Sequence, residues 1–464
     1  MDDFFNILLG VIADRYPGQA SADYDDLNVG IIVAMKRNIS EGRMGVARIA
    51  LVALALICIS VTGCTDADVT SDREHAFTQV WETINSSFYD ETFGGRDWQA
   101  LGDKYREKAI SAPTEKEFYI TLNTMLFRLE VSHIGVIPNE HPEWIGAPAT
   151  FADGEVGLNL RIVDDRLVVI RRKAMLGDLA LDLQPGTVIT RLNDLTLDDF
   201  MTEVSTPPVP AIRPQLLATE RAERELFRDA GETVEIVYLD ISGAEQTVEL
   251  TAFAREGAIE LIEGIPPVYL DFEKRVIDEQ FGYIRFNSFH GDLTGRIIAA
   301  IDEYRDMSGL IIDLRGNVGG DFQVRRAIAE HLIRESARVW QYVGRRGPDD
   351  INLDPSPNAY EGKVVFIVDE MSASSAEELP GAMQALGRAK VIGNTTAGMV
   401  LVADVLPLEI GASLVYPVAE TRFVNGYVPE GKGVVPDVAV PYERAALRSG
   451  SDSQLEAAIR TLQE

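Results

Sequence analysis

Cysteine is nearly absent from this 464-residue chain. Its two cysteines, Cys58 and Cys64, both lie near the N-terminus. The body of the chain can therefore form neither a disulfide framework nor a cysteine-based metal site. The five histidines show no HExxH or similar spacing, and this disfavours a zinc hydrolase.

Positive charge is scarce as well. The chain has 43 lysines and arginines against 73 aspartates and glutamates, which gives a formal net charge of −30. This excess of negative charge disfavours unaided binding to nucleic acid or to anionic lipid. A hydrophobic content of 46% and a charged content of 25% are ordinary for a soluble globular protein. The length suffices for two or three domains with a sizeable core.

A long hydrophobic run is also missing. The apolar run at residues 50–61 is too short to span a bilayer comfortably. Basic residues precede it and small residues follow, a layout typical of a secretory signal. The run ends in Val61-Thr62-Gly63-Cys64, which resembles a bacterial lipobox, and this resemblance implies a lipid on Cys64. The alternative is a soluble chain with an apolar N-terminal helix.

We therefore predict that residues 1–63 are an N-terminal extension and signal peptide. Met35 or Met44 would make a more usual start for such a signal. Thr65, in place of aspartate, follows the cysteine, and in the lipoproteins that this segment resembles it favours the outer membrane. The predicted location is the bacterial cell envelope, as a periplasmic lipoprotein anchored to the membrane through its lipid.

Helical patterns dominate residues 64–145. Apolar residues recur at helical spacing from Phe77 to Phe88, and a second helical pattern covers Trp98–Ala109. Thr114 and Glu117 form a capping box that predicts the start of a third helix. That helix runs into Ser132-His133 and a strand-like stretch. We predict an N-terminal helical domain over this range.

Short β-like runs replace the helices in residues 146–255. Their order resembles a PDZ domain, a small module that takes peptide C-termini by strand addition. The loop at residues 155–158 loosely matches the carboxylate-binding loop of such domains, and residues 205–229 interrupt the pattern. The alternative is an unrelated small β domain with no peptide groove.

Strand and helix patterns alternate from residue 256 onward, which predicts α/β packing. An apolar run that starts at Val365 leads into the small residues 372–376, and a helical pattern follows. A serine cluster between a strand and a helix presents a hydroxyl and backbone N–H groups, which are two parts of an acyl-transfer site. The alternative is a plain N-cap serine.

Three further pieces have candidate roles. The glycine turn, Gly316–Gly320, lets backbone N–H groups approach a ligand closely, as an oxyanion hole requires. For this piece alone, a tight turn between a strand and a helix is the better interpretation. His133 stands beside the hydroxyl of Ser132, although a lone histidine is more often structural than catalytic. Glu430 lies in a loop, where acids are usually solvated.

The combination and order of these pieces resemble the C-terminal processing (tail-specific) peptidase family, which includes the tricorn core protease. The resemblance covers roughly residues 75–440. Asp313–Gly320 is similar to the DLRxNxGG turn of the family, and Ser372–Glu377 to its nucleophile segment. The resemblance implies that Ser374 is the nucleophile. It also implies an oxyanion hole formed by the N–H of Ser375 and an N–H of the Gly319-Gly320 pair.

The chain departs from one branch of that family. The processing peptidases use a serine–lysine dyad, with the lysine directly after a Thr-x-Gly segment. Met399 stands at this position, and a thioether cannot act as a general base. Lys390 comes too early in the segment to replace it.

The tricorn branch instead uses a serine–histidine pair and a late glutamate, which Ser132-His133 and Glu430 match. The resemblance implies that His133 takes the proton of Ser374. An ordinary imidazole pKa near 6.5 suits that role. Ser132 and Glu430 would then orient the ring, as the acid does in other triads.

The sequence thus predicts a multidomain α/β protein. Its parts are an N-terminal helical domain (64–145), a PDZ-like β domain (146–255) and a crotonase-like α/β catalytic core (256–464). The resemblance implies a serine endopeptidase that acts on proteins or peptides, with no metal or organic cofactor and no nucleic-acid partner. The alternatives are a non-catalytic peptide- or ligand-binding relative on the same fold, and a small-ester hydrolase.

Overall fold

The computed structural model describes residues 66–145, 152–173, 182–203, 214–255, 258–259 and 268–464. Thr70–Glu464 form one compact unit. No helix in the described ranges is long and apolar enough to cross a membrane. The predicted signal segment and Cys64 lie outside these ranges, so both remain predictions.

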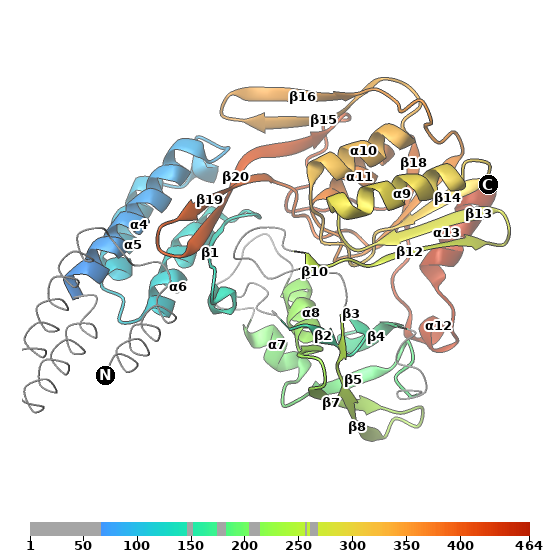
Figure 1. The fold of residues 1–464 in the computed structure, drawn as a ribbon, viewed down its shortest axis with the longest axis horizontal. Coiled ribbons are helices and arrows are strands. Elements are labelled where there is room, and N and C mark those ends of the chain that lie inside the picture. The colour runs from blue at the N-terminus through green and yellow to red at the C-terminus, as the bar shows by residue number, and fades with distance from the viewer. Residues whose placement is uncertain (1–65, 146–151, 174–181, 204–213, 256–257, 260–267) are drawn as a thin grey trace, which may run out of the picture. The chain divides into compact units, whose positions relative to one another are not determined.

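Three helices follow one another at the start of the described chain, as the sequence predicts: α4 (Asp66–Ser87), α5 (Trp98–Ile110) and α6 (Glu115–Leu126). The capping interaction at α6 is confirmed, because Thr114 Oγ1 accepts the Glu117 N–H at 3.2 Å. The apolar faces of these helices share one buried cluster with Leu408 and Leu414. Helices from the start of the unit therefore pack against strands from near its end, at the blue and red-brown elements of Figure 1.

The described residues between 152 and 255 form an antiparallel sheet with two helices, which we call the small β region. The strand order is β3-β4-β5-β7-β8. The strands are β3 (Leu158–Val163), β4 (Arg166–Arg172), β5 (Val188–Leu192), β7 (Thr233–Leu239) and β8 (Glu245–Thr251), beside β2 (Gly154–Glu155), β6 (Phe227–Arg228) and β9 (Phe253–Ala254). The helices are α7 (Leu197–Glu203) and α8 (Pro214–Arg224). The sequence also predicts a short helix at residues 176–183, most of which lies outside the described ranges.

The largest sheet carries the predicted α/β pattern, in the order β12-β13-β14-β17-β18-β21. Only its first pair is antiparallel. The strands are β12 (Phe272–Ile277), β13 (Phe281–Phe286), β14 (Gly309–Asp313), β17 (Lys363–Val368), β18 (Ala389–Gly393) and β21 (Val438–Ala439). Their helices are α9 (Gly291–Glu303), α10 (Phe322–Leu332), α11 (Ser375–Ala385) and α13 (Ser453–Gln463), and a short α12 (Arg444–Arg448) precedes the last.

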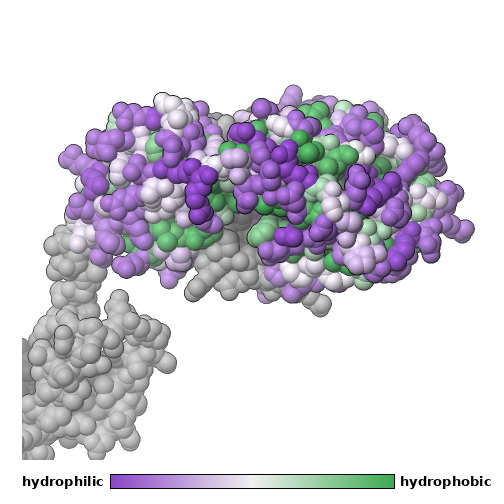
Figure 2. All heavy atoms as spheres, turned by 90° about the horizontal axis from the view of Figure 1, so that it is seen from above, coloured by the Kyte–Doolittle hydropathy of each residue, from purple (hydrophilic) through white to green (hydrophobic). Residues whose placement is uncertain are grey.

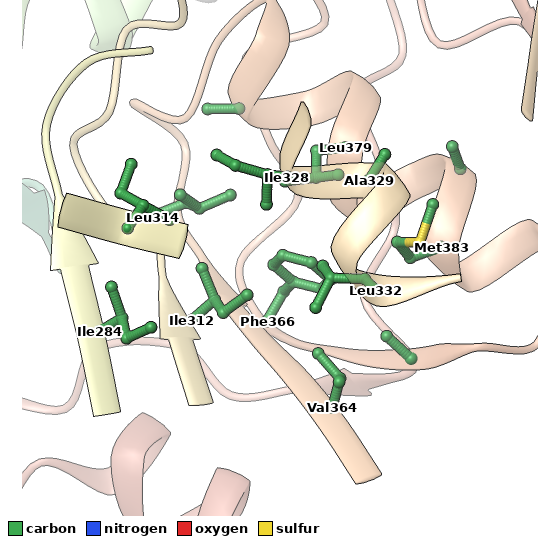
Figure 3. Close-up of a cluster of buried hydrophobic side chains, with 14 of the residues drawn as sticks. Ile284, Ile312, Leu314, Ile328, Ala329, Leu332, Val364, Phe366, Leu379 and Met383 are labelled. Atoms are coloured by element: carbon green, nitrogen blue, oxygen red, sulfur yellow. The ribbon is translucent and has the colours of Figure 1, made fainter. Parts of the chain in front are cut away.

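Both faces of this sheet are buried, so its strands read as continuous apolar runs. Ile312 and Phe366 lie in the cluster on the side of α9, α10 and α11, and Figure 3 shows Phe366 beside Leu332 of α10. The alternate residues Ile311 and Ile367 pack with α13 on the other face. The carboxyl ends of β14 and β17, which bear the candidate turns, are thereby held rigidly.

A second sheet joins segments that are far apart in the sequence, and the sequence analysis did not predict it. Its order is β1-β20-β15-β16, with β19 also paired to β20. The strands are β1 (Gly135–Pro138), β15 (Ala337–Gly344), β16 (Gly347–Leu353), β19 (Val402–Leu408) and β20 (Ala412–Phe423). Gly135 of β1 lies opposite Val415 of β20. This pairing fixes the position of Ser132-His133, directly before β1.

The outer surface fits the acidic composition. The face drawn in Figure 2 is mostly hydrophilic, and its hydrophobic residues form scattered groups. Two of the exposed large apolar side chains belong to this part of the chain: Val318 lies within the glycine turn and Phe322 two residues after it.

Candidate active site

Ser374 stands between the end of β17 and the first residue of α11. Its backbone has φ 54° and ψ −122°, a conformation that is strained for a residue with a side chain. Two acceptors hold its N–H group: the carbonyl oxygen of Met399 at 2.9 Å and Glu377 Oε1 at 3.3 Å. A sharp strand-to-helix turn of this kind exposes the nucleophilic serine in other hydrolases.

The glycine turn lies directly against this serine. A Cβ atom added to Gly319 would be 2.7 Å from the Cβ of Ser374 and 3.0 Å from the backbone nitrogen of Ser375. The φ of Gly319 is +95°, so both space and backbone conformation require glycine there. The structure thus brings together the two turns that the sequence analysis selected.

Some of the backbone N–H groups near Gly319 and Ser374 already donate hydrogen bonds, and others do not. The Gly319 N–H already donates to Asn317 Oδ1 at 2.8 Å. The N–H groups of Gly320 and Ser375 have no hydrogen-bond acceptor among the described residues. Of the glycine pair, Gly320 is therefore the better candidate for an oxyanion donor, together with Ser375.

Ser132, His133 and Glu430 form a hydrogen-bonded cluster, which we call the base cluster. Ser132 Oγ donates to Glu430 Oε2 at 2.9 Å and lies 2.8 Å from His133 Nδ1. Because that hydroxyl has a single proton, the network assigns the donor in the second contact to Nδ1–H of the imidazole. This tautomer leaves Nε2 with a lone pair, as a general base requires.

Burial sets the protonation of the base cluster. Burial lowers the pKa of His133 to about 4, so the ring is neutral at neutral pH. The ordinary value near 6.5 expected from the sequence is therefore wrong for this environment. Burial also raises the pKa of Glu430, against the opposing effect of the N–H groups of Val400 and Ser132. Glu430 is thus partly buried, and both its oxygens accept hydrogen bonds, unlike the solvated loop acid that its sequence context suggests.

A buried asparagine fixes the segment that carries the histidine. Asn123 of α6 accepts the Val136 N–H at 2.9 Å and donates to the Val136 carbonyl oxygen at 2.8 Å. Because this side chain satisfies both backbone groups of Val136, β1 is attached to α6 on one side and to β20 on the other. His133 itself has a φ of 54°, so the chain turns sharply there.

Residues 398–400, the bridge segment, connect the two halves of the site. Glu377 accepts the N–H groups of Gly398 at 2.7 Å and Met399 at 2.8 Å. Glu430 accepts the Val400 N–H at 2.9 Å. The Met399 carbonyl oxygen in turn accepts the Ser374 N–H. Ser374 and the base cluster are therefore linked through three consecutive residues, although no direct hydrogen bond joins Ser374 to His133.

Sequence reasoning missed the role of Glu377. Its side chain is fully buried and also accepts the hydroxyl of Thr396. Burial raises its pKa to about 7, against its hydrogen bonds to Thr396, Met399 and Gly398. The Ser-x-x-Glu spacing from Ser374 is a capping-box pattern and could have identified it.

Neither Lys390 nor Met399 offers an alternative base. Lys390 is exposed and pairs with Asp437 at 3.0 Å. The side chain of Met399 belongs to an apolar cluster with Leu216 and Met371. Among the described residues, no group of three or more His, Cys, Asp or Glu side chains could hold a metal ion.

Two family models and several curated proteins match this chain. Residues 280–440 match peptidase family S41, and residues 70–127 match the tricorn protease C1 domain. The chain is 24% identical over 420 residues to the carboxyl-terminal-processing protease of a Picosynechococcus species, which covers 89% of this chain and 95% of that protein. It is 25% identical over 402 residues to the protein of the same name from a Synechocystis species, which covers 84% and 87% of the two chains.

A solved structure supports the fold. The photosystem II D1 C-terminal processing protease aligns with a TM-score of 0.55 and 21% identity, covering 85% of this chain and 98% of that chain. At this identity the likeness shows a shared multidomain α/β fold, and the roles of individual residues still depend on the geometry described above.

Proposed function

We propose that this chain, a serine peptidase of family S41, is an endopeptidase whose nucleophile is Ser374 and whose general base is His133. The observation that carries this proposal is the bridge segment. It binds the backbone of Ser374 on one side and Glu430 of the base cluster on the other. A non-catalytic relative would have no need to hold a neutral imidazole and a strained serine in one network.

The proposed reaction follows from these positions. His133 Nε2 takes the proton of the Ser374 hydroxyl as the oxygen attacks the peptide carbonyl carbon. The N–H groups of Gly320 and Ser375 stabilise the negative charge on the carbonyl oxygen. The imidazolium then gives its proton to the departing amine, and water hydrolyses the acyl-enzyme by the same route in reverse. Ser132 and Glu430 hold the ring and stabilise its charged form.

The small β region is the proposed site for engaging an extended peptide. Strand β3 is at the end of its sheet, and its other edge faces α8. An edge strand beside a helix is the arrangement that PDZ domains use for strand addition. We further propose a lipid on Cys64 and a location in the cell envelope, from the sequence alone. Replacing Cys64 by alanine would then release the protein from membranes.

The test uses the mature protein and its Ser374→Ala variant. We expect a fluorophosphonate probe to label the first protein and not the second, and only the first to cleave a denatured protein. Mass spectrometry of the labelled peptide identifies the modified serine. Labelling with turnover of small esters but of no peptide would favour the small-ester hydrolase. An unlabelled protein that binds peptides without cleaving them would favour the non-catalytic alternative.

A further inference from the structure

Arg161 belongs to the small β region, yet its charged group ends in the α/β part of the chain. It lies on β3, and its side chain is 2% exposed. Its Nε and one terminal nitrogen both donate to Asp369 Oδ2, at 2.8 and 2.7 Å. The other terminal nitrogen contacts Glu223 Oε1 at 3.2 Å and the Leu160 carbonyl oxygen at 2.6 Å. All three guanidinium nitrogens are therefore occupied.

Asp369 receives this charge at the beginning of the nucleophile turn, residues 369–374. It directly follows β17 and is completely buried. Its second oxygen, Oδ1, accepts the N–H of Gly316 at 2.9 Å and that of Met371 at 3.2 Å. The first N–H belongs to the glycine turn and the second to the nucleophile turn. One carboxylate therefore holds both turns together.

The ionisation of Asp369 depends on its partners. Burial alone would raise its pKa, but Arg161 and the Gly316 N–H hold it below the usual range. Without the guanidinium, only the charge of Arg315 and hydrogen bonds would oppose the effect of burial. Asp369 would then more readily take up a proton, admit water or move toward solvent. Each of these responses weakens its hold on the two N–H groups.

We propose that Arg161 is a positioning residue for the reaction: it keeps Asp369 ionised and in place, and thereby sets the relative position of the oxyanion donors and Ser374. This inference rests on the proposed function. If Arg161 acts in this way, the small β region contributes a residue that positions the candidate active site. This role is separate from any contact that the region makes with a peptide. The residue would act through Asp369 and would not touch the substrate.

A second ion pair provides a matched control. Arg171 lies on the neighbouring strand β4 and pairs with Glu273 of β12 at 3.1 Å. It also links the small β region to the large sheet, but its side chain is 30% exposed and contacts neither turn. A variant at Arg171 removes one link of this kind and leaves Asp369 unchanged.

The first experiment compares Arg161→Ala, Arg161→Lys and Arg171→Ala with the parent enzyme. We expect Arg161→Ala to lower kcat and the rate constant of fluorophosphonate labelling by about 10- to 100-fold, because small displacements of reacting groups are costly. KM should stay within about threefold, since the substrate-binding groups are unchanged. Arg161→Lys should give an intermediate rate, and Arg171→Ala should react like the parent.

The second experiment needs no activity. Hydrogen exchange, read by mass spectrometry on peptides covering residues 314–320 and 369–376, should lose protection in Arg161→Ala and not in Arg171→Ala. Unchanged exchange in both turns would overturn the inference. The inference would also be overturned if Arg161→Ala showed faster exchange in both turns but kept the labelling rate and the kcat of the parent. An inactive parent would refute the proposed function, and the exchange result would still decide whether Arg161 holds the turns.

Discussion

Ser374 and His133 are held by different kinds of structure. Ser374 stands at the carboxyl end of a parallel strand, where consecutive strands and helices build the surroundings from neighbouring parts of the sequence. His133 stands before β1, whose position depends on pairing with β20. The comparison shows that local order shapes the turn of Ser374, whereas a long-range pairing positions His133, the proposed base. Variants can therefore test the two sides separately.

The largest effect is expected on the base side. His133→Ala should lower kcat/KM on the order of 10³-fold, because no described side chain of the cluster can replace the imidazole as proton acceptor. The measurement is steady-state cleavage of a fluorogenic peptide. His75→Ala, an exposed histidine on α4, serves as the control and should keep full activity. A His133→Ala enzyme with most of its activity would contradict the assignment.

The pH profile of the parent enzyme sharpens the same point. Since burial lowers the pKa of His133 to about 4, kcat/KM should rise as the pH increases through about 4 and His133 loses its proton. A profile that rises only at alkaline pH would instead indicate a lysine base.

The next prediction concerns Glu377, which holds the backbone near Ser374, and its effect on the free energy of unfolding. Burial raises the pKa of Glu377 from an ordinary 4.5 to about 7, so between these values the folded state binds a proton that the unfolded state has lost. The free energy of unfolding should therefore fall by about 3 kcal/mol as the pH rises through this window. Glu377→Gln should remove this contribution, measured by urea unfolding at pH 4.5 and 8.

The control for this experiment is the other capping pair. Glu117 stands in the same position relative to Thr114, but it is exposed at the start of α6. Glu117→Gln should leave the pH dependence of the parent intact. If both variants follow the parent, Glu377 is not the group responsible.

A smaller effect is expected at Glu430. This carboxylate contacts the imidazole through the Ser132 hydroxyl and not directly. Glu430→Gln should therefore lower kcat by roughly 100-fold or less, below the loss of the base itself. Ser132→Ala should fall in the same range. Glu420→Gln on β20, where Glu420 pairs with Arg422, is the control, and an equal loss there would point to a general charge effect.

Met399→Ala should have the smallest effect. The backbone of Met399 holds Ser374 and Glu377, but its side chain only packs in an apolar cluster. We expect kcat/KM to change less than about fivefold. Met399 stands where the processing peptidases have the lysine of their dyad. A loss as large as that of His133→Ala would mean that this position has a catalytic role here as well.

The same contrast explains what could be predicted from the sequence. The strand before Ser374, the helix after it and the glycine turn have strong local patterns, and the structure has all three. The Thr114 cap is local too. The partners of β1 and β20 are not encoded in a local pattern, because half-buried alternating strands can pair with many others.

The buried ion pair of Arg161 and Asp369 is the second feature that the sequence does not predict. Arg161 and Asp369 look like ordinary surface residues in the sequence, and only the fold shows that their charges meet. Two signals were available: Asp369 follows a buried parallel strand, where functional groups gather, and Glu377 has capping-box spacing. Neither signal identifies a partner 208 positions away.

The contact between Ser132 and Glu430 joins residues 298 positions apart. During synthesis the N-terminal helices and β1 emerge first, and the glutamate emerges only when the chain is nearly complete. Until then Ser132 lacks its carboxylate partner, and β1 gains its partner strand β20 only shortly before. A growing chain that already contains its nucleophile therefore cannot assemble the base cluster. If Ser374 and His133 act as proposed, this order of emergence keeps the unfinished chain inactive while its own unfolded segments are exposed.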